Sequence, residues 1–392
     1  MIRLFILSVF CFLCFQSFAE DSCHIRISLI TLSPGDELYT VFGHSAIRVK
    51  DSLKKEDLIY NYGTFDFNEP NFLTKFINGK LLYYVSNEDF IPFIQYYQSE
   101  GRTITEQVLN LTCQEKNNIL SYLYNNLQGD NKFYKYDFLS DNCTSRLRDI
   151  IQKNATEKIS FKRVVTQNST YRNLLHHDLD YHDHQWIKMG IDLLLGSRTD
   201  KTMNDQDALF LPDYLKTSFA NSTKAGQSFV QQTIDLSANA NSVYKKQFFK
   251  GPLFFFSLFA LFIFYLTYLQ KPRVNEILYR FDSFMFFVIG LIGWMLIYLW
   301  IVSDQSNYKD NYNLLWAVPT HFIFSFFSQT NKPWINYYFK STFVIYVLLL
   351  LAWFWIPQCL NSAYLPIIIM VMVRSGIRGF KNVKKLNGRK VL

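Results

Sequence analysis

The sequence predicts an α+β water-soluble domain followed by an all-α transmembrane bundle. An apolar N-terminal run that ends in small residues indicates export. After it, β-type and helical periodicities alternate with turns as far as residue 247. Long apolar runs then fill most of the chain from 248 to 376. Together these observations indicate an exported protein that is anchored by its C-terminal half.

The segment 1–19 has the pattern of a signal peptide. Arg3 supplies the basic start, an apolar run follows, and Ser17 and Ala19 place small residues where a signal peptidase reads the chain. We expect cleavage after Ala19. The mature protein would then begin at residue 20.

The segment 20–155 predicts an antiparallel sheet with helices that cover it. β-rich runs bounded by Gly and Pro turns occur at 25–32, 45–49, 58–62, 81–85 and 104–111. Helical spacing occurs at 90–99, 112–127 and 143–152. The segment 156–247 is more polar, with one helical stretch at 185–195. We expect it to be an extension that packs on the first domain.

The segment 248–376 predicts about five transmembrane helices. The apolar runs lie at 251–270, 283–302, 314–329, 341–359 and 363–376. The last run is short, so Arg374 is expected to snorkel toward the headgroups. The segment 377–392 is a basic tail, which the positive-inside rule places in the cytoplasm. The N-terminal domain is therefore expected to be periplasmic, on the outer face of the cytoplasmic membrane.

The net charge of +8 does not indicate a nucleic-acid partner. Residues 1–250 hold 27 basic and 28 acidic residues, whereas residues 251–392 hold 13 and 4. The excess of basic residues lies in the membrane half, where it indicates the orientation of the chain in the membrane. The predicted partner surface is the membrane, and the sequence predicts no oligomeric state.

Three cysteines remain in the soluble domain after signal cleavage: Cys23, Cys113 and Cys143. An odd number in an oxidising compartment predicts one disulfide and one free thiol. We expect the pair to be Cys23 with Cys113, which leaves Cys143 free.

Cys143 is the candidate nucleophile. It follows Asp141 and Asn142, two good N-cap residues, and begins an amphipathic helix. The helix dipole and nearby Arg146 would both favour the thiolate. A buried structural cysteine or half of a disulfide is the alternative interpretation.

His44 is the candidate general base, because it lies at a turn that leads into a strand and could face a cleft. Asn61 is the candidate that orients the imidazole, since strand alternation points it away from its two Tyr neighbours. Asp66 lies behind Asn61 as a second candidate. Each of these could instead be a polar residue at a strand end, a turn or an edge.

The run 176–184 is crowded with His and Asp. A stable metal site needs three or four ligands that converge in fixed geometry, whereas a polar surface loop of this composition needs none. We therefore expect a surface loop, no metal and no cofactor.

Several strings of this sequence resemble the Lnb-type lipoprotein N-acyltransferases. They lie at 42–48, 60–67, 79–81, 101–102, 141–146, 210–213 and 311–316. The combination covers most of the mature chain and is far more specific than any single motif. Gln305 is a departure, because a His is expected in this loop, and the departure argues against a catalytic role for the loop here.

The resemblance implies a circularly permuted, papain-like thiol-protease fold, in which His44 precedes Cys143. It implies that the Cys takes an acyl chain as a thioester and passes it to the α-amino group of a lipoprotein's N-terminal cysteine. The implied partners are diacylated lipoproteins and, as acyl donor, their own diacylglyceryl group or a phospholipid.

Two other functions remain open from the sequence. The same nucleophile and base cleave amides, so an envelope thiol peptidase or amidase is one alternative. A non-enzymatic, membrane-anchored envelope scaffold is the other. The substrate class separates the two enzymes, and the reactivity of Cys143 separates both from the scaffold.

Overall fold

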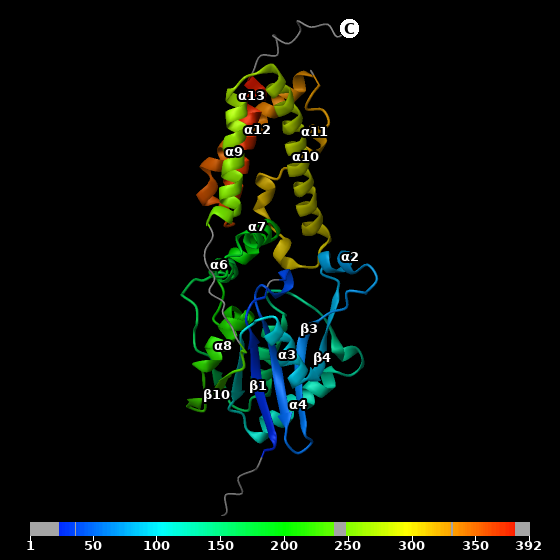
Figure 1. Cartoon of the computed structure of the whole chain (residues 1–392), viewed down its shortest axis with the longest axis vertical. Coiled ribbons are helices and arrows are strands. Elements are labelled where there is room, and N and C mark those ends of the chain that lie inside the picture. The colour runs from blue at the N-terminus through cyan, green and yellow to red at the C-terminus, as the bar shows by residue number, and fades with distance from the viewer. Residues whose placement is uncertain (1–22, 36, 239–247, 331, 381–392) are drawn as a thin grey trace, which may run out of the picture.

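The computed structural model describes residues 23–35, 37–238, 248–330 and 332–380. The predicted signal peptide and the basic tail beyond residue 380 lie outside this range. Figure 1 shows the sheet domain at one end of the molecule and the long apolar helices at the other, with α6 and α7 between them.

The soluble domain is built on a seven-stranded antiparallel sheet with the order β10-β5-β1-β2-β3-β4-β6. The strands are β1 (Ile25–Leu32), β2 (His44–Asp51), β3 (Glu56–Thr64), β4 (Leu82–Asp89), β5 (Ile104–Leu109), β6 (Phe133–Lys135) and β10 (Val230–Asp235). A small second sheet contains β7 (Ile159–Ser160), β8 (Thr223–Lys224) and β9 (Gln227–Ser228). The mixed α/β domain with an antiparallel sheet is as predicted.

Both faces of the sheet are covered because its central strands are apolar on both sides. Leu29 packs with the helices α4 (Cys113–Asn126) and α5 (Cys143–Asn154), whereas its neighbour Ile30 packs with α3 (Phe90–Ser99) on the other face. A disulfide joins Cys23, before β1, to Cys113 at the start of α4. The predicted pairing is therefore confirmed, and Cys143 is a free thiol.

The extension is part of the same fold, since its strand β10 pairs with β5 in the central sheet. It also supplies the helices α6 (Tyr171–Tyr181), α7 (Gln185–Leu194) and α8 (Pro212–Ala220). The prediction of a loop over the His- and Asp-rich run is wrong, because α6 covers most of it. Leu174, Leu175 and Leu179 form a buried stripe on α6 that the polar composition concealed.

The membrane half contains α9 (Pro252–Tyr268), α10 (Pro272–Val302), α11 (Thr320–Ser325), α12 (Pro333–Leu351) and α13 (Leu365–Phe380). Among the described residues, three helical stretches are long and apolar enough to cross a membrane: Pro272–Val302, Pro333–Leu351 and Ser362–Phe380. The apolar helix α9 is shorter.

The predicted span 314–329 is not one helix. It is broken into a short turn and the six-residue α11, with Pro319 immediately before α11. Its backbone packs directly on two glycines of α10: a Cβ on Gly290 would lie 2.0 Å from the Phe322 nitrogen, and one on Gly293 would lie 2.1 Å from the Ala317 oxygen. Apolar composition predicts burial in the membrane here and does not reveal the break.

Arg374 does not snorkel. It is 2% exposed, and its guanidinium binds both carboxylate oxygens of Asp282 on α10 at 2.8 Å. It also donates to Thr267 of α9 at 3.0 Å. A charge within a helical bundle is tolerated when it is paired and hydrogen-bonded, so Arg374 joins three helices instead of reaching for the headgroups.

Several contacts between described residues join the soluble domain to the membrane half, and two groups of them lie at helix ends. In the first, the α7 junction, side-chain amides bind the C-terminal carbonyls of α7. Asn311 donates to the Leu193 oxygen at 2.8 Å and Asn313 donates to the Asp192 oxygen at 2.8 Å. These carbonyls have no partner within the helix itself, so the amides act as its C-terminal cap.

In the second contact, the α2 junction, the short helix α2 (Phe72–Ile77) and the residue after it bind the end of α10. The Tyr298 hydroxyl donates to the Asn78 side chain at 3.0 Å, and the Asp304 N–H donates to the Asn78 carbonyl at 2.9 Å. The Ser303 hydroxyl donates to the Ile77 carbonyl at 3.2 Å. The α7 and α2 junctions therefore hold the soluble domain at separate places.

We predict that Asn313→Ala lowers the free energy of unfolding of the full-length protein. Asn313 is fully buried and also accepts a hydrogen bond from the Trp316 indole at 2.9 Å. Each buried group left without a partner should cost about 1–3 kcal/mol. Thermal unfolding in detergent measures the loss, with the exposed Asn117→Ala as the matched control. Equal stability of the two variants would show that the α7 junction contributes little.

Candidate active site

Cys143 is the first residue of α5, and the residue before it sets its position. The Asn142 side chain accepts the Ser145 N–H at 2.8 Å, while the Ser145 hydroxyl accepts the Asn142 N–H at 2.9 Å. Asn142 also donates to the carbonyls of Phe138 and Phe210 at 2.8 and 2.9 Å. This capping box confirms the predicted helix start and fixes the thiol at the positive end of the helix.

His44 is the first residue of β2 and pairs with Leu32, the last residue of β1. The turn before it depends on Gly43, which has a φ of 77°. A Cβ on Gly43 would lie 2.5 Å from the Leu32 carbonyl oxygen, so only glycine fits. The turn therefore fixes His44 at the start of β2, beside the end of β1.

Asn61 binds the His44 ring as predicted. The His44 Nε2–H donates to the Asn61 side-chain oxygen at 2.6 Å. Tyr60 and Tyr62 point to the opposite face and are buried in the core, as strand alternation requires. Because Nε2 is occupied, the Nδ1 nitrogen is the one available to Cys143.

His44 and Cys143 form a coupled pair. Burial acts to raise the pKa of the Cys143 thiol, but the charge and hydrogen bond of His44 outweigh it and lower that pKa to about 7. Burial likewise acts to lower the pKa of His44, but the Cys143 charge and hydrogen bond raise it above its usual value. The pair is therefore stabilised as thiolate and imidazolium.

The backbone N–H of Ser45 and the hydroxyl of Thr144 also lower the pKa of Cys143. The thiol lies 3.7 Å from the Thr144 oxygen, which in turn lies 3.1 Å from the Ser45 hydroxyl. These groups lie on two different elements, α5 and β2. The environment that favours the thiolate therefore forms only when α5 and β2 pack together.

Arg146 has a different role from the predicted one. Its guanidinium pairs with both carboxylate oxygens of Asp141, at 2.7 and 2.8 Å, and stacks 3.5 Å from the Tyr134 ring centre. Because Asp141 neutralises this charge, the groups that chiefly favour the thiolate are His44, Ser45 and Thr144. Arg146 and Asp141 instead brace the loop before α5.

Asp66 is exposed, and its carboxylate accepts the Asn68 N–H at 2.8 Å. It closes a turn after β3, which is the alternative that the sequence had left open. Asn61, rather than Asp66, is the group that contacts His44.

Two neighbours of the site were not predicted. Tyr136 and Cys143 both lie next to Gly63. The Cys143 Cβ and the Tyr136 ring would each be 3.7 Å from a Cβ built on that glycine, so Tyr136 lies beside Cys143. Glu88 lies behind Asn61 on β4, where burial raises its pKa while His44 and a hydrogen bond with Asn61 act to lower it. Neither residue follows a recognisable motif, and only the pairing of β3 with β4 brings Glu88 into place.

The loop after α10 lies next to the site. Gln305 donates to the Tyr136 carbonyl at 2.8 Å, and its side chain lies against Gly79. Its contact is thus with the backbone beside Cys143.

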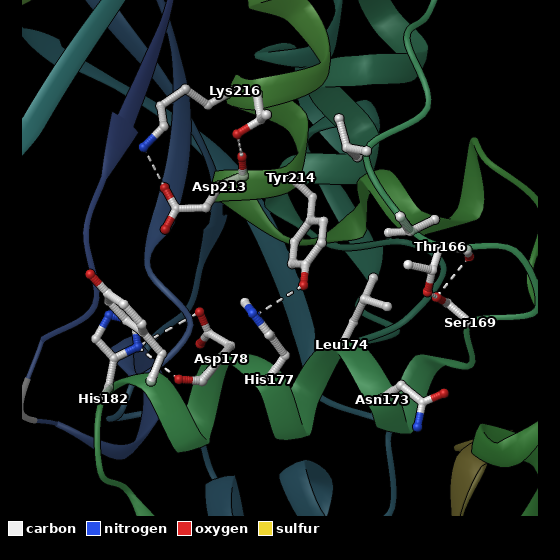
Figure 2. A pocket seen from close by; sticks show the side chains of 14 residues that line it. Thr166, Ser169, Asn173, Leu174, His177, Asp178, His182, Asp213, Tyr214 and Lys216 are labelled. Carbon is white, nitrogen blue, oxygen red and sulfur yellow. Dashed lines mark hydrogen bonds and ion pairs between the residues drawn. The ribbon is translucent and has the colours of Figure 1, made fainter. Parts of the chain in front are cut away.

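A cavity of about 570 Å³ lies between α6 and α8, and Figure 2 shows its polar lining, including His177, Asp178 and Tyr214. Burial and the neighbouring Asp213 raise the pKa of Asp178 to about 7. Neither Cys143 nor His44 lines this cavity, so it is separate from the pair.

The comparison with protein-family models agrees with this geometry. The Lnb N-terminal periplasmic domain matches residues 19–177, and the Lnb transmembrane domain matches residues 244–386. The chain belongs to the Lnb family. The family is linked to lipoprotein N-acylation, and its first domain, which in this chain contains His44, Asn61 and Cys143, is periplasmic. No curated protein and no solved structure matches the chain.

We predict that Cys143 is alkylated by iodoacetamide with a rate that rises through about pH 7, because the thiolate is the reacting form. His44→Ala removes the compensating charge and leaves burial, so the midpoint should move above the ordinary thiol value. The measurement uses a Cys359→Ser background, which removes the other described free thiol. An unchanged midpoint in His44→Ala would show that the two groups are not coupled.

Proposed function

We propose that this Lnb-family protein transfers an ester-linked acyl chain, through a thioester on Cys143, to the α-amino group of a lipoprotein's N-terminal cysteine. The observation that carries the proposal is the Cys143–His44–Asn61 arrangement, which lies next to the loop after α10. His44, Asn61 and Cys143 occur in that order along the chain, which suits a permuted papain-like domain.

In the first step the Cys143 thiolate attacks the ester carbonyl of the donor. A carbon–sulfur bond forms, the ester carbon–oxygen bond breaks, and the His44 imidazolium gives its proton to the departing alkoxide. Asn61 keeps the ring in the tautomer and orientation that this transfer needs. The products of the step are an acyl thioester and a lipid that has lost one chain.

In the second step the neutral α-amine attacks the thioester carbonyl. A carbon–nitrogen bond forms, the carbon–sulfur bond breaks, and neutral His44 takes the proton released by the amine. The pair returns to thiolate and imidazolium. In both steps the backbone amides at the start of α5, including that of Cys143, would stabilise the oxyanion.

The membrane half supports a substrate that is itself in the bilayer. The α7 and α2 junctions attach the site to the transmembrane helices, so donor and acceptor would reach Cys143 at a high effective concentration. The partners of this proposal are a diacylated lipoprotein and, as donor, that lipoprotein or a phospholipid.

The proposed orientation is a periplasmic catalytic domain with a cytoplasmic C-terminus in the inner membrane. Labelling of intact cells with an impermeant maleimide tests it. Labelling of a cysteine placed at Gln329, without labelling of one placed at Ser306, would contradict this orientation and indicate the opposite one.

We predict that Cys143→Ala and His44→Ala each lower N-acylation by more than about a thousandfold, since nucleophile and base act as one unit. The double variant should be little worse than either single one. Asn61→Ala should cost less, because it orients the ring and does not react. The mass of a lipoprotein's N-terminal peptide reports the product, and Cys359→Ser is the control for loss of a thiol elsewhere.

Retention of N-acylation by Cys143→Ala would contradict this mechanism. If the wild type released free fatty acid or cleaved peptides and never modified an amine, a thiol hydrolase would replace the acyltransferase. An unreactive Cys143 would favour the scaffold.

A further inference from the structure

A patch of exposed apolar side chains surrounds α2. It consists of Leu38, Tyr39, Phe67, Leu73, Phe76 and Ile77, and we call it the α2 patch. Leu73 is 66% exposed and Phe67 is 64% exposed. Apolar side chains gathered in one place on a soluble face indicate a surface that is covered in use.

The height of the α2 patch relative to the membrane is fixed by α10. Tyr298 lies within the membrane-length helix Pro272–Val302 and donates to Asn78, the residue that follows α2. Ile301, in the last turn of the same helix, is 76% exposed, as expected for a side chain that faces lipid. The end of α2 is thus attached to the last turns of α10, where the apolar run 283–302 ends.

An aromatic series leads inward from the α2 patch. The ring of Phe67 lies 4.8 Å from that of Phe65, Phe65 lies 5.3 Å from Tyr83, and Tyr83 stacks on Tyr136 at 4.5 Å. Tyr136 is the half-buried residue beside Cys143. The series therefore connects an exposed apolar surface with the thiol through rings in contact.

The attachment to α10 decides what covers the patch. A partner protein could cover an apolar surface at any height, but a surface held at the end of a transmembrane helix meets the lipid that surrounds that helix. Phe and Tyr are also side chains typical of the membrane interface.

We propose that the α2 patch lies among the acyl chains of outer-leaflet phospholipids, and that the aromatic series guides one such chain to Cys143. The second half of this proposal rests on the proposed function, whereas the first half does not. An acyl chain that entered along apolar rings would bring its ester to the thiolate without crossing water.

Insertion is tested by the depth of a fluorescent label. Leu73→Cys and Leu53→Cys are each made in a full-length Cys143→Ala, Cys359→Ser background and labelled with NBD in phosphatidylcholine–phosphatidylglycerol nanodiscs. Leu53 is the matched control, because it is 73% exposed and lies in the β2–β3 turn at the far end of the sheet. A doxyl group near the start of the lipid chain should quench the label at 73 and not at 53.

Equal quenching at the two positions would overturn the insertion. Quenching at 73 by spin labels on the headgroup alone would place the patch above the chains and would overturn it as well.

The route is tested by Leu73→Glu, with Leu53→Glu as control, through acylation of Cys143. The ratio of the rate with phospholipid vesicles to the rate with a water-soluble short-chain thioester should fall about tenfold for Leu73→Glu only. An unchanged ratio would overturn the route. If the wild type took acyl groups from neither donor, the route would fail. The proposed function would fail as well only if a diacylated lipoprotein were also inactive as donor, and the depth measurement would still decide the insertion.

Discussion

The hydrogen bonds between the Asn311 and Asn313 amides and the last carbonyls of α7 are the constraint on which the arrangement depends. A helix end that is buried in a protein must have its carbonyls satisfied, and here the partners come from a loop between membrane segments. Separation of the soluble domain from the bundle would consequently leave these carbonyls and amides without their hydrogen-bond partners. Together with the α2 junction, they hold the Cys143–His44 pair beside the membrane half.

The reactivity of Cys143 also depends on contacts between separate elements. Burial alone would raise the pKa of Cys143, and the thiolate is favoured because His44, the Ser45 N–H and Thr144 converge on it from α5 and β2. His44 is in turn oriented by Asn61 on β3. Three elements must therefore be docked correctly before the thiol becomes reactive, which couples the chemistry to the fold of the domain.

The sequence predicted the parts of this site that are set by local rules. N-cap residues identified the helix start at Cys143, and alternation beside Tyr60 and Tyr62 identified Asn61. Features set by tertiary packing were missed: the leucine stripe of α6 is hidden among His and Asp, and the Asp282 partner of Arg374 lies on another helix. Tyr136 was missed because its place beside Cys143 depends on a loop conformation that no periodicity reports.

The central claim is that Cys143 carries the acyl chain. The most direct measurement is the mass of the tryptic peptide that contains Cys143, taken from full-length protein incubated with a lipid donor and no amine acceptor. The account predicts a mass increase of one acyl group that neutral hydroxylamine removes and that is lost in His44→Ala. An acyl group found on another residue, or transfer to an amine with Cys143 unmodified throughout, would contradict it.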